Sequence, residues 1–143
     1  MKFATVLSSI VVSAAAAISK RDVAFNVSNF FAQCLPHSTQ CLVDFTVVQL
    51  DTMETISVEC KTVISANTDG TLPDIKEAAC TESSHTFDLV RGPAGIILTV
   101  SQPVSPNSNR IGSHLLPSSD FVISQEPNAV TESYVGPAGF HLE

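Results

Sequence analysis

Hydrophobic and polar residues alternate along most of this chain, which is the pattern of half-buried β-strands. Residues 55–60 (Thr-Ile-Ser-Val-Glu-Cys) repeat with a period of two, whereas residues 42–48 have the higher apolar density of a more central strand. Turn-forming residues separate nearly all of these segments. The pattern predicts about nine short strands, at residues 23–27, 42–48, 55–60, 86–90, 96–101, 114–116, 121–124, 130–135 and 140–142.

Two identical Gly-Pro-Ala-Gly tetrapeptides, at residues 92–95 and 136–139, each stand between an apolar strand end and a new apolar start. Proline presets one turn position and glycine permits unusual backbone angles, so we expect a pair of turns. A duplicated structural unit is the alternative, although the flanking residues share only an aliphatic pattern. Residues 74–79 are the one stretch that favours a short helix. These features predict an all-β fold, a compact antiparallel barrel or sandwich with one core.

The first 17 residues have the features of a secretory signal peptide: a basic start at Lys2, an apolar run and a cluster of alanines. The apolar run is shorter than the roughly 20 residues that a membrane-spanning helix needs. Residues 18–21 then form a short pro-segment that ends in the dibasic site Lys20-Arg21, a processing signal of the fungal kind. We therefore expect a secreted, extracellular protein whose mature part, residues 22–143, is a single domain.

Removal of this leader leaves four basic residues against all fourteen acidic ones, a formal charge of −10 with neutral histidines. Such a charge repels phosphate backbones, and the four cations are too scattered to form a patch. The mature sequence also lacks a basic amphipathic helix. We expect neither nucleic-acid binding nor membrane insertion.

The mature chain has an even number of cysteines: Cys34, Cys41, Cys60 and Cys80. In an oxidising compartment they predict two disulfides, for which three pairings are formally possible. Local pairing, Cys34 with Cys41 and Cys60 with Cys80, is favoured, and each bridge would contribute about 2.5–3.3 kcal/mol through loop entropy. The alternative is a zinc site that adds His37 and His85, but no spacing of the C-x-x-C type presets two ligands. We expect no metal and no cofactor.

Catalytic motifs are absent from the sequence, including G-x-S-x-G, H-E-x-x-H and a glycine-rich phosphate loop. Paired carboxylates of the glycosidase kind remain an alternative, because several acidic residues lie in or beside predicted strands: Asp44, Asp51, Glu54, Glu59 and Asp88. Solvated strand faces explain these residues better. Tryptophan is absent, and the preference for phenylalanine fits core filling. The sequence therefore predicts a protein that is not an enzyme.

Two segments are candidates for recognition loops. A Cys34–Cys41 bridge would close residues 35–40 into a small loop that presents Pro36 and His37 at low entropic cost, although His37 bonding its own loop backbone is the plainer alternative. Residues 105–113 form a polar stretch bracketed by prolines, which predicts an exposed loop.

Asn26 starts the one glycosylation sequon and lies in a predicted strand, where a glycan requires the asparagine to face water.

Several segments resemble secreted hypersensitive-response-inducing elicitors of plant-associated filamentous fungi: Cys-Leu-Pro-His-Ser-Thr-Gln-Cys at 34–41, Phe45, Thr-Met-Glu-Thr at 52–55, Ser-Gln-Pro-Val-Ser at 101–105 and Gly-Ser-His-Leu at 112–115. This resemblance covers most of the mature chain. More remotely, residues 60–80, followed by Thr-Phe-Asp at 86–88 and Ile-Ile-Leu at 96–98, are similar to the Alternaria major allergen family of compact β-barrels. The second resemblance implies the same Cys60–Cys80 bridge.

The chain departs from the allergen family at both ends. No cysteine follows Cys80, so that family's C-terminal disulfide is missing, and no mature cysteine precedes Cys34 at the place used for covalent dimers. A covalent dimer is therefore not expected, and the oligomeric state stays open.

What the elicitor resemblance implies is recognition, because such proteins act in the apoplast, provoke plant cell death and defence, and in some cases bind thaumatin-like pathogenesis-related proteins. We expect a secreted elicitor or effector that recognises an apoplastic plant protein, thaumatin-like proteins being candidates. The negative charge would steer it to a basic partner. The alternatives are an extracellular barrel that carries a small phenolic or apolar ligand, and a fungal cell-surface protein without a plant target.

Overall fold

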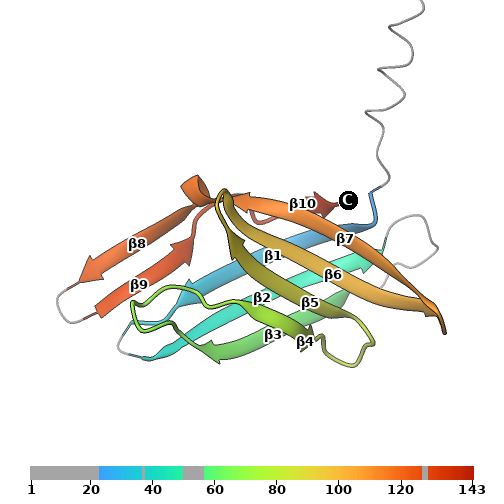
Figure 1. Ribbon diagram of the computed structural model, residues 1–143, viewed down its shortest axis with the longest axis horizontal. Helices are drawn as coiled ribbons and strands as arrows, with labels where there is room; N and C mark the ends of the chain where they lie inside the picture. Colours follow the sequence, from blue (N-terminus) through green and yellow to red (C-terminus); the bar gives the residue numbers. More distant parts are fainter. Residues whose placement is uncertain (1–22, 37, 50–56, 127–128) are drawn as a thin grey trace, which may run out of the picture.

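The computed structural model describes residues 23–36, 38–49, 57–126 and 129–143, and it shows an all-β fold of two antiparallel sheets with two disulfides (Figure 1). The predicted fold class is confirmed. Several predictions fall outside the described residues: the signal peptide, the pro-segment with Lys20 and Arg21, His37, Asp51 and Glu54.

Ten strands form the two sheets within the described part of the chain. The six-stranded sheet has the order β3-β2-β1-β9-β8, with β10 also paired to β1, and the four-stranded sheet has the order β4-β5-β6-β7. The first sheet consists of β1 (Phe25–Cys34), β2 (Gln40–Gln49), β3 (Val58–Ser65), β8 (Phe121–Glu126), β9 (Ala129–Tyr134) and β10 (Phe140–Leu142). The second consists of β4 (Ile75–Ala79), β5 (Thr86–Gly92), β6 (Gly95–Ser105) and β7 (Ser108–Pro117).

The helix expected at residues 74–79 is wrong, because this segment is strand β4. Ile75 is buried and pairs with Leu89 of β5, and Ala79 pairs with Thr86. Local propensity favoured a helix turn, but burial of Ile75 against the second sheet and pairing with β5 require an extended backbone.

The exposed loop expected at residues 105–113 is also wrong in its conformation, since these residues belong to the β6–β7 hairpin. Ser105 pairs with Ser108, which leaves two residues for the turn. Prolines and polar side chains are compatible with strands here because this end of the hairpin extends beyond the core, and Val104 and Ile111 are both more than half exposed.

The two Gly-Pro-Ala-Gly tetrapeptides have different roles. The first makes the tight β5–β6 hairpin, in which Gly92 pairs with Gly95, as predicted. The second connects β9 to β10 along one edge of β1, where the Phe30 amide donates to the Ala138 carbonyl at 2.9 Å. The Tyr134 hydroxyl donates to the Pro137 carbonyl at 2.7 Å and fixes this connection. Burial, and secondarily the charge of Asp120, raises the pKa of Tyr134.

The core lies between the sheets and follows from the alternation of each strand. In β2, Val43, Phe45 and Val47 are fully buried, and the residues between them are half-buried on the opposite side. The Phe45 ring meets the Phe87 ring of β5 edge-to-face, with 5.1 Å between centroids. This contact joins the two sheets. In Figure 1, strands β5, β6 and β7 run at an angle across strands β1, β2 and β3.

The two sheets are separate, as in a sandwich, but their edges are linked at two places, which we call seams. At one seam the Cys60–Cys80 disulfide connects β3 to the segment after β4. At the other, Ser113 of β7 and Glu143 exchange backbone hydrogen bonds of 3.2 and 3.0 Å. Gly112 permits this approach, because a Cβ atom there would lie 2.9 Å from the Leu142 side chain.

His114 packs at the second seam. Its ring stacks on Phe140 of β10, with 4.4 Å between centroids and 15° between planes. Burial lowers the pKa of His114, and the nearby charge of Glu143 opposes that effect. Neutral His114 therefore fits the folded protein better than the cation does.

The cross-sheet contact gives a direct test of the core. Phe45→Ala should destabilise the folded protein by about 3–5 kcal/mol, because it removes a fully buried ring and leaves a cavity between the sheets. Phe31→Ala is the matched control on the neighbouring strand, where the ring is 42% exposed, and should cost about 1 kcal/mol or less. Urea unfolding with intact disulfides measures both, and equal losses would contradict the assignment of the core.

The lowered pKa of His114 at the second seam predicts that the folded protein loses stability in mild acid. Because the pKa of His114 is lower in the folded state than its ordinary value of 6.5, the unfolded chain takes up the proton first as the pH falls. The stability that neutral His114 contributes is fully present above pH 6.5 and is lost as the pH falls through the lowered pKa of the folded state. His114→Phe keeps the ring contact and should reduce the change in urea midpoint between neutral and mildly acidic pH. An NMR titration that places the pKa of folded His114 at or above 6.5 would contradict this prediction.

Candidate functional site

An open groove of about 1000 Å³ lies at the end of the molecule where β1 turns into β2. Three segments border it: the loop between β1 and β2, the chain that follows β3, and the start of β9. Its walls combine small apolar and hydroxyl or amide side chains: Leu35, Ser38, Thr39, Ala66, Asn67, Thr68, Asp69, Gly70, Ala129, Val130 and Thr131. Such a composition suits noncovalent recognition of a mixed polar and apolar surface.

The loop between β1 and β2 forms the first wall. Its ends are joined by the Cys34–Cys41 disulfide, which bridges a directly paired position of the two strands and confirms the local pairing favoured from the sequence. The Leu35 amide donates to the Gln40 carbonyl at 2.9 Å. Pro36 is exposed but does not line the groove. The predicted loop therefore borders the groove through Leu35, Ser38 and Thr39, while His37 lies outside the described residues.

The turn after β3 forms the second wall. The Gly70 amide donates to the Asn67 carbonyl at 2.9 Å, and the Glu132 amide of β9 donates to the Gly70 carbonyl at 3.2 Å. Gly70 has φ of +83°, and a Cβ atom there would lie 2.0 Å from the Val130 carbonyl oxygen. Only glycine permits both the backbone angle and this contact, so the turn packs directly on β9.

Asp69 carries the one charged side chain that lines the groove among the described residues. Its Oδ1 accepts hydrogen bonds from the Thr71 hydroxyl at 2.6 Å and the Thr71 amide at 3.2 Å. The hydroxyl bond and then the amide bond lower the pKa of Asp69. The carboxylate is fully exposed and stays ionised at neutral pH, which gives the groove a fixed negative charge.

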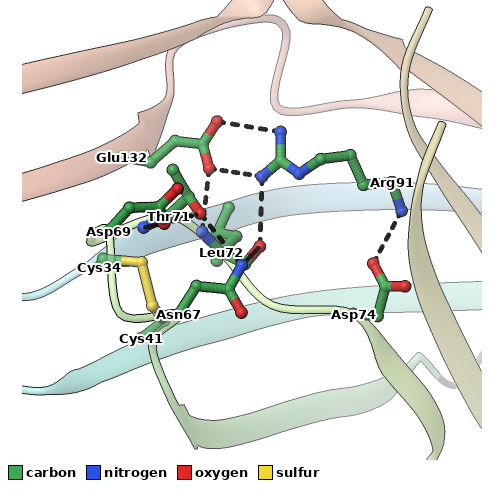
Figure 2. Close-up of polar contacts among 9 residues, drawn as sticks. All are labelled: Cys34, Cys41, Asn67, Asp69, Thr71, Leu72, Asp74, Arg91 and Glu132. Atoms are coloured by element: carbon green, nitrogen blue, oxygen red, sulfur yellow. Dashed lines mark hydrogen bonds and ion pairs between the residues drawn. A yellow bond between two sulfur atoms is a disulfide. The ribbon is translucent and has the colours of Figure 1, made fainter. Parts of the chain in front are cut away.

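Behind the groove, Glu132 holds β9, β5 and the segment after β3 together (Figure 2). Its Oε1 accepts from the Leu72 amide at 2.9 Å and from an Arg91 guanidinium nitrogen at 2.6 Å. The same Arg91 nitrogen donates to the Leu72 carbonyl at 3.2 Å. Glu132 is 5% exposed and Arg91 is 39% exposed. The buried charge is thus paired and hydrogen-bonded, as burial requires.

Arg91 is also fixed through its backbone, because its amide donates to Asp74 Oδ1 at 3.0 Å. Asn67 adds a side-chain bond of 3.3 Å to the Leu72 carbonyl. The chain from 67 to 74 is therefore held at several points although it is not part of a sheet, and the groove has a preorganised wall.

The residues predicted from the sequence are distributed over the molecule. Asn26 is half-buried on the outer face of β1, opposite the buried Phe25 and Val27. Asp88 accepts a 2.7 Å bond from the Glu77 amide, and Asp44 pairs in register with Lys61. None of the three described carboxylates among the acid-base candidates lines the groove: Asp44, Glu59 and Asp88.

The cysteines leave no thiol for the alternative zinc site, because both pairs are oxidised. Among the described residues, no cluster of His, Cys, Asp and Glu could hold a metal ion.

Sequence reasoning missed Asp69, Arg91 and Glu132. Asn-Thr-Asp-Gly at 67–70 is a turn-forming sequence, but nothing local places it against β9, and Arg91 and Glu132 lie 41 positions apart. Only the packing of β5 and β9 brings them together.

The fold and this site define a class, a disulfide-stabilised all-β protein with a preorganised surface groove. No protein-family model, curated protein or solved structure matches the chain. Within the described residues, no helix has the length and apolarity needed to cross a membrane. The two disulfides are typical of proteins from an oxidising, extracellular environment.

The groove wall depends on Glu132, which predicts a specific loss of order. Glu132→Ala should destabilise the protein by about 2–3 kcal/mol, because Leu72 loses its acceptor and Arg91 its counter-charge. Glu132→Gln keeps an acceptor oxygen and should cost about half as much. Urea unfolding measures the loss, and hydrogen exchange should accelerate at the Leu72 amide in the alanine variant. Unchanged exchange there would contradict the role of Glu132 as the support of this wall.

Proposed function

We propose that this chain is a secreted elicitor or effector that triggers plant defence and hypersensitive cell death by noncatalytic recognition of an apoplastic plant protein. The observation that carries the proposal is the groove, whose two walls are held by the Cys34–Cys41 bridge and by the Glu132 network. A surface ordered before binding loses little conformational entropy when a partner docks. The resemblance of the segment 34–41 to fungal elicitors supplies the biological setting.

The charge of the mature chain supports a basic partner. A formal charge of −10 speeds encounter with a cationic surface, and ionised Asp69 provides one fixed acceptor inside the groove. A basic thaumatin-like protein has the chemistry that fits. The predicted secretory leader and both disulfides agree with an apoplastic location.

The alternative function, transport of a small phenolic or apolar ligand, has less support from the packing. Phe25, Phe45 and Phe87 are fully buried between the sheets and fill the space that an internal ligand would need. Such a ligand would have to bind in the open groove instead. A cell-surface role without a plant target would leave the groove without a function.

The proposal predicts that folded residues 22–143 cause cell death and an early oxidative burst when infiltrated into leaves. A heat-denatured sample should be inactive, because recognition requires the shaped surface. The association rate with an isolated apoplastic partner should fall as salt is added, since salt screens the steering charge. No response to protein that is verified as folded would contradict the proposal and favour the carrier or cell-surface alternative.

The groove itself is tested with two substitutions that change charge equally. Thr68 lines the groove, whereas Thr81 is exposed near Glu59, at the other end of β3. Thr68→Arg should weaken partner binding by more than about tenfold and abolish cell death, and Thr81→Arg should leave both nearly unchanged. Equal effects of the two variants would show that net charge, and not the groove, controls recognition.

A further inference from the structure

One sheet edge has no partner among the described residues. The edge of β3 is linked to the segment after β4 by the Cys60–Cys80 bridge, and the edge of β7 is linked to the end of β10 by the Ser113–Glu143 bonds. Strand β8, in contrast, is the last strand of the six-stranded sheet, and among the described strands it pairs only with β9. In Figure 1 the β8–β9 hairpin extends to the left of the region where the two sheets overlap.

The backbone groups that β8 turns outward follow from its register. The Val135 amide donates to the Asp120 carbonyl at 2.7 Å, which makes Asp120 and Val135 a hydrogen-bonded position of the β8–β9 register. Antiparallel pairs alternate, and therefore Val122 and Ser124 bond to β9 while Ile123 and Gln125 direct their N–H and C=O groups away from it. The Phe121 amide is occupied by the Ser118 carbonyl, but the Phe121 carbonyl also points outward.

The side chains of β8 do not protect this edge. Val122 is 46% exposed on one face, and Ile123 is 50% exposed on the other, beside Glu132. Residues 121–125 contain no proline and no charged side chain. Exposed edges of soluble proteins usually carry such residues, because they prevent pairing with another strand.

We propose that β8 is a dimerisation edge, at which two copies of this chain pair antiparallel about a two-fold axis through Ile123. Self-pairing is favoured because the outward groups are self-complementary in this register: Ile123 faces its own copy, and each Gln125 amide meets a Phe121 carbonyl. The two Ile123 side chains then cover each other. The dimer is noncovalent and does not depend on the proposed function.

The negative charge of the chain predicts how the dimerisation should depend on salt. Each copy carries a formal mature charge of −10, and acidic residues flank the uncharged span at positions 120 and 126. Repulsion between copies is screened by salt, so self-association should become stronger as NaCl is added. Binding of a basic partner at the groove has the opposite salt dependence, which separates the two interactions.

Sedimentation velocity over a range of protein concentrations, at low and high NaCl, tests the proposal. The expected result is a monomer–dimer equilibrium that shifts to dimer with concentration and salt. Ile123→Pro removes an outward N–H and should weaken dimerisation by more than about tenfold, because proline cannot donate to an added strand. Ile123→Val keeps that N–H and should dimerise nearly as the wild type does.

Hydrogen exchange keeps the test decisive if Ile123→Pro does not fold. In the wild-type protein, the Ile123 and Gln125 amides should gain protection as the concentration rises, whereas the Val122 and Ser124 amides, already bonded to β9, should not change. A monomer under all conditions, or a dimer that leaves the Ile123 and Gln125 amides unprotected, would overturn the proposal. Groove variant Thr68→Arg should leave dimerisation intact.

Discussion

Packing of Phe45 against Phe87, between the two sheets, organises the core of this protein. This contact joins the six-stranded sheet to the four-stranded sheet in the core, and both rings are almost completely buried. Neither sheet can bury its apolar face alone, so both sheets gain stability from this shared layer. The seams at Cys60–Cys80 and Ser113–Glu143 then hold the sheet edges in the arrangement that the core requires.

Glu132 shows how the same packing creates a site away from the core. A carboxylate that is 5% exposed is tolerated because Arg91 and the Leu72 amide satisfy it. Because the buried Glu132 carboxylate needs hydrogen-bond donors, it holds the segment around Leu72, which belongs to no sheet. This contact makes one groove wall rigid, and the Cys34–Cys41 disulfide restrains the wall formed by the loop between β1 and β2.

The edges of the two sheets differ in how they are paired. Where sheet edges meet, the Cys60–Cys80 disulfide and the Ser113–Glu143 backbone bonds link them, whereas the outer edge of β8 has no partner among the described strands. The groove and this edge occupy different strands and carry different chemistry. One presents an ionised carboxylate among hydroxyl groups, and the other presents backbone donors between uncharged side chains.

The pattern of residues along the chain predicted the all-β class, the two local disulfides and most strand positions, because period-two alternation and cysteine spacing are local properties. It did not determine that residues 75–79 are a strand or that 108–113 belong to a hairpin, since pairing with β5 and β6 overrides their local preference. The segment at 35–40 was identified as a candidate from sequence, but its partners in the groove were not. Tertiary structure alone brought Asp69, Arg91 and Glu132 to one end of the molecule, because a contact across 41 positions exists only after the two sheets have packed.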